Sequence, residues 1–167
     1  MSSDLYRNIV IATDGSANFR KVISCGIEIA KLSGATVYVL YVVDTPSLIS
    51  EIWTAGKEAI REMMVNDGKK VISKVKKIIE ESGVEVKEVL LEGHPSDEII
   101  KFAEHNNMDL IVMGTLGKTG FEKFMMGSVA QKVVRCSNVP VMVVRNWDQE
   151  DSKIICTQEN GSVANSL

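Results

Sequence analysis

Four residues with a defined spacing could together bind phosphate. Gly114 and Gly117 follow a short apolar run at 110–113, and nine residues separate Gly117 from the pair Gly127 and Ser128. The apolar run is typical of a buried parallel strand, and the periodic segment after Ser128 is typical of a helix. A glycine-bearing loop between a strand and a helix N-terminus presents backbone N–H groups to an anion, which the helix dipole also favours. The spacing therefore predicts a nucleotide site.

Three other phosphate-related motifs fit this sequence poorly. A P-loop would need a glycine at the position of Val112 and a helix beginning at Lys118, but Gly120 follows within two residues. A dinucleotide-binding fingerprint would need further glycines after the first strand, where 14–18 does not supply them. Asp14 has no acidic neighbour before it, so a phospho-accepting receiver domain is disfavoured.

Asp14 is a second candidate for ligand contact because it directly follows the first predicted strand, 7–13. A turn aspartate can also simply bond its own backbone, and this alternative stays open. We find no Ser-His-Asp or Cys-His arrangement, and Ser128 is interpreted as a helix cap rather than a nucleophile. No catalytic residue is therefore assigned.

Apolar periodicity predicts strands alternating with helices. The pattern favours an α/β fold, a single doubly wound, five-stranded parallel sheet with helices on both faces. Right-handed crossovers would bring the carboxyl ends of all the strands to one edge, where such sheets bind ligands. Asn66-Asp67-Gly68 is expected to break or kink a helical region, and serines are expected to cap the helices. The predicted strands are 7–13, 35–43, 84–91, 110–113 and 139–145, and the predicted caps are Ser16, Ser96 and Ser128.

Composition restricts the classes of protein and partner. A chain of 167 residues with 45% hydrophobic and 25% charged residues is typical of one soluble globular domain. The net charge of -3 argues against a nucleic-acid or anionic-membrane partner. The sequence shows no signal peptide and no apolar run long enough to span a bilayer, so we expect a cytoplasmic protein. Its three cysteines and two histidines show no metal-ligand spacing.

The glycine pattern resembles the G-2x-G-9x-G-S/T motif of the universal stress protein family, in its ATP-binding branch. The resemblance covers about residues 4–146 and includes the segments 11–16, 41–44, 93–95 and 139–144. It implies a Rossmann-like, adenine nucleotide alpha hydrolase-like fold for a universal stress protein domain at 1–146. The polar C-terminal tail, 147–167, lies outside that core.

The resemblance also implies which residues bind ATP. The adenosine would lie beside the end of the first strand, and the adenine would meet the backbone of Val42. The residues after the fourth strand and at the following helix would hold the ribose and phosphates, and Mg²⁺ would be carried mainly by phosphate oxygens. Some members have proline at the position of Ala12. The implied binding residues are Ala12, Thr13, Asp14, Val42, Met113, Gly114, Gly117, Gly127, Ser128 and Val129.

Members of this family usually form homodimers, often through the last strand. An apolar edge strand at Val141 to Val144 should also be paired on physical grounds. We expect a nucleotide-dependent regulatory protein of the stress response, with a protein partner that the sequence does not identify. The alternative is a slow ATPase or adenylate-handling enzyme at the same site, because Lys118 and Lys123 lie near the phosphate loop. A third possibility is a dimeric interaction module whose site is degenerate.

Overall fold

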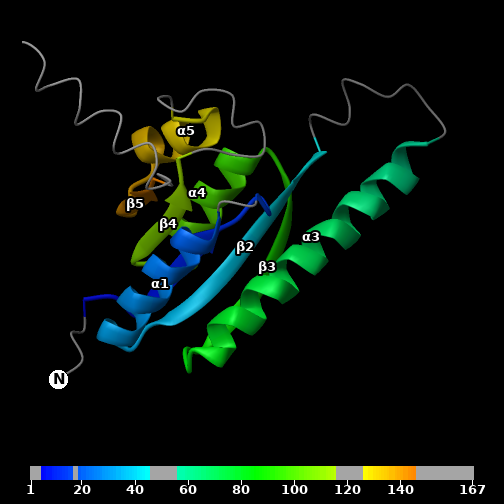
Figure 1. Cartoon of the computed structure of the whole chain (residues 1–167). Coiled ribbons are helices and arrows are strands. Elements are labelled where there is room, and N and C mark those ends of the chain that lie inside the picture. The colour runs from blue at the N-terminus through cyan, green and yellow to red at the C-terminus, as the bar shows by residue number, and fades with distance from the viewer. Residues whose placement is uncertain (1–4, 17–18, 46–55, 116–125, 146–167) are drawn as a thin grey trace, which may run out of the picture.

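The computed structural model describes residues 5–16, 19–45, 56–115 and 126–145 (Figure 1). Within these residues, strands and helices alternate along the chain, as the apolar periodicity predicts. The elements are β1 (Asn8–Ala12), α1 (Arg20–Ser33), β2 (Thr36–Asp44), α3 (Lys57–Glu81), β3 (Val86–Gly93), α4 (Pro95–His105), β4 (Leu110–Gly114), α5 (Ser128–Cys136) and β5 (Val141–Val144).

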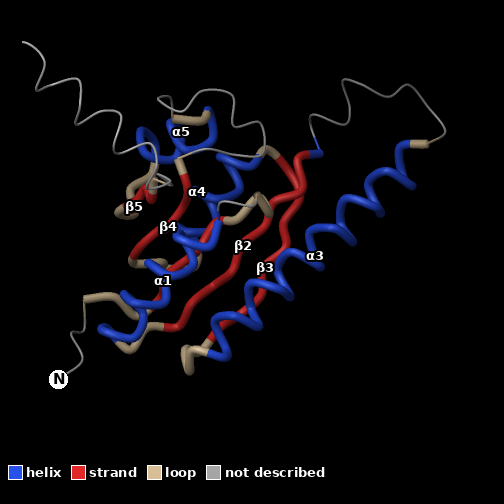
Figure 2. The backbone as a smooth tube through the Cα atoms, viewed as in Figure 1, coloured by secondary structure: helices blue, strands red, loops and turns tan. Residues whose placement is uncertain are grey.

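The five strands form one fully parallel sheet in the order β3-β2-β1-β4-β5 (Figure 2). The chain moves outward from β1 to β3 on one side and then crosses over to build β4 and β5 on the other. In the central register, Val10 lies opposite both Tyr38 of β2 and Ile111 of β4. The strand order therefore reverses between β1 and β4, which is where doubly wound sheets bind ligands. The predicted doubly wound α/β fold is confirmed.

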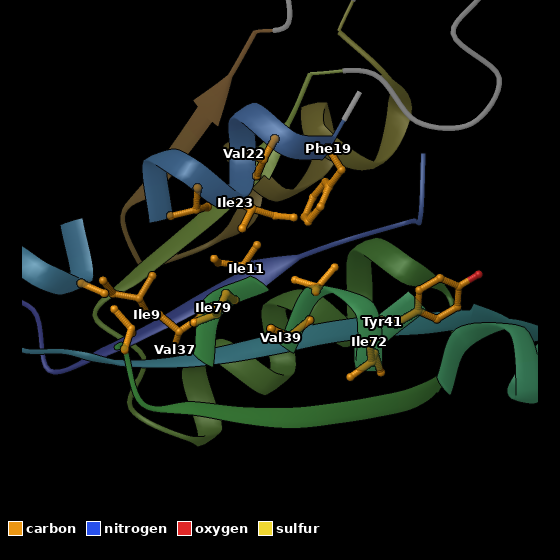
Figure 3. Packing of buried hydrophobic residues seen from close by; sticks show 14 of the residues in the cluster. Ile9, Ile11, Phe19, Val22, Ile23, Val37, Val39, Tyr41, Ile72 and Ile79 are labelled. Atoms are coloured by element: carbon orange, nitrogen blue, oxygen red, sulfur yellow. The ribbon is translucent and has the colours of Figure 1, made fainter. Parts of the chain in front are cut away.

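Two apolar layers cover the two faces of the sheet. Side chains alternate between the faces along a strand, so Ile9 and Ile11 pack with α1 and α3, while Val10 packs with α4 and α5. All three are fully buried, which explains why the central strand is apolar from Ile9 to Ala12. Figure 3 shows the first layer, where Ile23 of α1 lies beside Ile11. This burial supplies the main stabilising term of the fold.

The N-terminal half of the fold depends on a close approach between α1 and β1. A Cβ at Gly26 would overlap Cδ1 of Ile11, so a larger residue would force either this side chain or the helix to shift. At the end of α1, Gly34 adopts φ 72°, and its N–H donates to the carbonyl of Ala30. This left-handed residue ends the helix in the way that glycine favours.

The predicted break at Asn66-Asp67-Gly68 is wrong, because α3 runs without interruption through these residues. Gly68 is buried, and a Cβ there would lie 2.9 Å from side-chain atoms of both Leu90 and Tyr41. The local composition is typical of a turn. Packing of the helix on β2 and β3 outweighs that preference, and glycine allows the close contact.

The predicted serine caps are also wrong. None of the three helices concerned has a side-chain hydrogen bond at its cap. The N–H of Ser16 donates to Oδ1 of Asp14, and Ser96 is fully buried in α4 with its Oγ 3.0 Å from Nδ1 of His94. The N-cap residues are instead Phe19 for α1, His94 for α4 and Gly127 for α5.

Several sequence-based predictions fall outside the described residues. These are the predicted tail at 147–167, the glycine at Gly117, and Lys118 and Lys123 near the predicted phosphate loop. Among the helices that the structure describes, none is both long and apolar enough to cross a membrane.

Candidate nucleotide site

A cavity of about 410 Å³ lies at the carboxyl edge of the sheet, where the strand order reverses. The ends of β1, β2 and β4 form its floor, and side chains of all four described helices or their caps contribute to its walls. Nearly all of the predicted binding residues meet here, although Gly117 lies outside the described residues. Those that line the cavity are Ala12, Thr13, Asp14, Val42, Met113, Gly114, Gly127, Ser128 and Val129.

Asp14 presents an unused hydrogen-bond acceptor beside this cavity. Its Oδ1 accepts a hydrogen bond from the N–H of Ser16 at 2.9 Å, and Oγ1 of Thr13 accepts one from the N–H of Gly15 at 3.1 Å. Oδ2 of Asp14 is buried and has no hydrogen-bond partner in the described part of the chain. A buried carboxylate oxygen without a partner is unfavourable, so it can accept a bond from a hydroxyl or amino group.

Val42 offers a backbone donor and acceptor because β2 extends beyond β1. The last strand pair joins Ala12 to Leu40, and the N–H of Thr13 donates to the carbonyl of Leu40 at 2.9 Å. Thr36 donates its N–H toward β1, so by alternation Val42 also directs its N–H and C=O to that side. Among the described residues, no backbone hydrogen bond joins Val42 to the β1 side. A planar base could use both groups.

The N-terminus of α5 forms the opposite side of the cavity. The N–H of Gly127 donates to the carbonyl of Thr115 at 2.7 Å, and the carbonyl of Gly127 accepts the N–H of Gln131 at 2.9 Å. The first-turn N–H groups that remain for an anion are those of Ser128, Val129 and Ala130. Sequence reasoning missed Ala130, although it follows from the predicted start of the helix. Gly127 therefore closes the turn rather than donating to a ligand.

Gly127 has φ -61° and ψ 154°, an extended conformation that any residue adopts. A substitution at Gly127 would therefore not force a positive φ. What glycine supplies at this position is the absence of a Cβ at the rim of the cavity.

The cavity also has apolar walls that sequence reasoning missed. Phe19 reaches it from the start of α1, Met64 from α3 and Ile99 from α4. These residues are far apart in the sequence and look like ordinary core positions, so no local signal separates them from the rest of the core. None of the described lining residues is a lysine, arginine or histidine. The described walls thus combine apolar surface with backbone groups and the carboxylates of Asp14 and Asp44.

An ion pair fixes α5 relative to α4 beside the cavity. Nζ of Lys132 lies 2.6 Å from Oδ1 of Asp97, and the pKa of Asp97 is held below its usual range chiefly by this hydrogen bond. Pro95 and Val129, from the same two helices, line the cavity. Among the described residues, no group of three or more His, Cys, Asp or Glu side chains could hold a metal ion.

The strand order defines a doubly wound α/β protein, and its cavity and the N-terminus of α5 lie where sheets of this class bind ligands. The sequence profile of the universal stress protein family matches residues 5–145. Universal stress protein MJ0531 of Methanocaldococcus jannaschii is 43% identical over 147 residues, which cover 88% of this chain and 86% of that relative. The chain belongs to the universal stress protein family.

Solved structures agree with this assignment. Protein MJ0577 of the same organism superimposes with a TM-score of 0.76 at 28% identity, covering 87% of this chain and 99% of the other. The universal stress protein of Archaeoglobus fulgidus in complex with dAMP superimposes with a TM-score of 0.60 at 30% identity, covering 83% and 98%. The expected family and fold are confirmed.

Proposed function

We propose that this protein is an ATP-binding regulatory protein that acts as a homodimer in the cytoplasm. The observation that carries the proposal is the cavity at the strand-order reversal. It brings together binding residues predicted from separate parts of the sequence, and beside them lies Oδ2 of Asp14, which has no partner among the residues that the structure describes. The dAMP complex of the Archaeoglobus fulgidus relative supports an adenine nucleotide as the ligand class.

Different groups of the cavity match the adenine, the ribose and the phosphates of ATP. The free N–H and C=O of Val42 match the donor and acceptor pattern of an adenine edge. Oδ2 of Asp14 can accept a ribose hydroxyl, and the amides of Ser128, Val129 and Ala130 can bind phosphate at the helix N-terminus. A divalent ion such as Mg²⁺ would be held mainly by the phosphate oxygens.

Binding without rapid turnover is the function that this lining favours. Phosphoryl transfer relies on positive groups that neutralise charge on the phosphates. None of the described lining residues carries a positive charge. The second candidate, a slow ATPase or adenylate-handling enzyme, depends on Lys118 and Lys123, which lie outside the described residues. Multiple turnovers that Asp14→Ala abolishes would favour this enzyme.

The proposed dimer contact is the short edge strand β5. Its residues Val141 to Val143 are only partly buried or exposed, and Met142 is 39% exposed. An apolar strand edge of this kind favours pairing with a second copy. Analytical ultracentrifugation of wild type and Met142→Lys would test it, because the lysine should shift a dimer toward the monomer.

The first experiment is to denature the purified protein and identify any released nucleotide by chromatography and mass spectrometry. ATP at a ratio near one per chain would support an ATP-binding regulator. ADP or AMP would favour the enzyme. A protein that releases no nucleotide and also fails to bind MgATP in calorimetry would contradict the proposal and leave the interaction module.

A further inference from the structure

A second, smaller cavity of about 170 Å³ opens between the start of α1 and the middle of α3. The two helices cover the same face of the sheet (Figure 1). Apolar side chains, including Ile23, Val71 and Val75, form part of its wall. Arg20 contributes a positive charge from α1, and Lys74 contributes another from α3. The cavity therefore combines an apolar wall with cations from two sides.

Both cations lack a protein anion in the described part of the chain. Arg20 and Lys74 are exposed, and neither side chain forms an ion pair or hydrogen bond with a described residue. Some other cations of α3 do have partners. Lys70 lies 3.2 Å from Asp67, and Arg61 binds its carboxylate partners at 2.6 and 2.7 Å. The two charges at the cavity are thus available to an external anion.

The charge of Arg20 is unfavourable for its own helix. The first turn of α1 contains Arg20 and Lys21 and no acidic residue. In contrast, the first turn of α4 contains Asp97 and Glu98, as the helix dipole prefers. Positive charge at a helix N-terminus opposes that dipole. Helix stability therefore does not explain a cation at this position.

The same is true of Lys74. Lys70 and Lys77 lie one turn before and one turn after it on α3, and like charges at these spacings destabilise a helix. Both walls of the cavity thus carry positive charge that is locally unfavourable, in a protein whose net charge is -3. Local rules of this kind are typically broken where a site needs the charge.

We propose that this cavity docks an acidic segment of a partner protein. A glutamate or aspartate of that segment would place its carboxylate between Arg20 and Lys74, while its aliphatic stem packs on Ile23 and Val75. Charge complementarity favours this partner, because both unpaired groups at the rim are cations.

The docking cavity shares a wall with the candidate nucleotide site. Thr13, Ser16 and Phe19 line both cavities, and Asp14 lies within the same turn. If a ligand in one cavity stabilises one arrangement of this turn, it changes the affinity of the other cavity for its own ligand. The effect is reciprocal, so each ligand changes the affinity for the other by the same factor. This link rests on the proposed nucleotide function, whereas the docking itself does not.

Docking is tested first without nucleotide, with the full-length protein and a fluorescein-labelled hexaglutamate peptide in an anisotropy titration. The wild type should bind, and added NaCl should weaken binding by screening. The double variant Arg20→Glu and Lys74→Glu should bind at least about tenfold more weakly. Its Tm should equal or exceed that of the wild type, because both glutamates suit their helices. Loss of binding would then not reflect unfolding.

The matched control is Lys31→Glu with Lys57→Glu, which makes the same change of charge at exposed lysines that line neither cavity. It should keep the peptide affinity within about threefold of the wild type. Equal losses in the two double variants would overturn the proposal in favour of non-specific attraction. So would a wild type that does not bind hexaglutamate, or one that binds a short oligothymidylate more tightly.

The link to the nucleotide site has its own test. Saturating MgATP should change the affinity for hexaglutamate at least about twofold in either direction. Calorimetry on the same sample reports whether ATP is bound. If ATP binds and the peptide affinity stays the same, the link is wrong. If ATP does not bind, the proposed function fails while the docking result stands.

Discussion

Asp14 and Asp109 lie beside neighbouring strands at opposite edges of the sheet, and their second carboxylate oxygens have opposite surroundings. Oδ2 of Asp109, before β4, accepts hydrogen bonds from the N–H groups of Arg7 and Asn8, both at 2.8 Å. Oδ2 of Asp14, after β1, is buried without a partner in the described part of the chain. At the amino edge, the carboxylate of Asp109 joins β4 to the start of β1. At the carboxyl edge, Oδ2 of Asp14 is available to accept a hydrogen bond from a ligand.

This difference separates stability from binding within one sheet. A carboxylate that accepts two backbone N–H bonds stabilises the fold. One that lacks a partner destabilises it and is retained where a ligand supplies the missing bond. Substitutions at the amino edge should therefore lower stability, whereas substitutions at the carboxyl edge should lower nucleotide affinity.

The largest effect is expected for Gly127→Val at the carboxyl edge. The backbone of Gly127 suits valine, but the added side chain would crowd the rim of the cavity. We expect ATP affinity in calorimetry to fall at least about a hundredfold, with thermal stability nearly unchanged. Gly56 is a matched control, because it is also a helix N-cap with negative φ and a Cβ there would meet nothing within 4 Å. Unchanged affinity in Gly127→Val would mean that the site is misplaced.

Asp109→Ala should have the opposite effects: lower stability and nearly unchanged ATP affinity. It removes the acceptor of the Arg7 and Asn8 N–H groups, so the free energy of unfolding should fall by about 2–3 kcal/mol. ATP affinity should stay within about twofold of the wild type, because Asp109 lies at the other edge of the sheet. Chemical denaturation and calorimetry on the same protein would measure both. A large loss of affinity in a folded variant would break the comparison.

Asp14→Asn sharpens the comparison with the smallest possible change of shape. The amide oxygen can still accept the N–H of Ser16, but an NH₂ group replaces Oδ2, which has no partner among the described residues. ATP should bind about tenfold more weakly, because a donor of the ligand then faces another donor. Stability should stay the same or rise by up to about 1 kcal/mol. A clear loss of stability would show that Asp14 is structural.

A third carboxylate near the cavity, Asp97, should give the smallest effect. Its pKa is lowered from 3.8 in the folded protein, chiefly by the hydrogen bond from Lys132. The stabilisation is thus present above the unfolded pKa and is lost as the pH falls through the lower folded pKa. In Lys132→Met, Tm should decrease less between about pH 5 and pH 2, by a few degrees at most. An unchanged pH profile would show that this pair contributes nothing.

Much of the fold and of the site followed from local patterns. Apolar runs and β-branched residues identified all five strands, and the glycine spacing identified the rim formed by Gly114, Gly127 and Ser128. These features could be predicted because strand period and turn composition depend on a few adjacent residues.

Other features depended on contacts between distant segments. Gly68 stays helical because β2 and β3 pack against it, and Met64 and Phe19 reach the cavity only because α3 and α1 lie on one face of the sheet. The amides of the Ser128 turn became identifiable as free once the bond from Gly127 to Thr115 was seen.

The sequence by itself determined the class of fold, the family and the segments that meet at the carboxyl edge. Only the tertiary structure decided which atoms there lack a partner among the described residues, namely Oδ2 of Asp14 and the backbone groups of Val42 on the β1 side. It also decided that the carboxylate of Asp109 accepts the N–H of Arg7, and that Arg20 and Lys74 line the same cavity. The physical reason is that period and turn chemistry are local properties, whereas hydrogen-bond satisfaction depends on every neighbour in space.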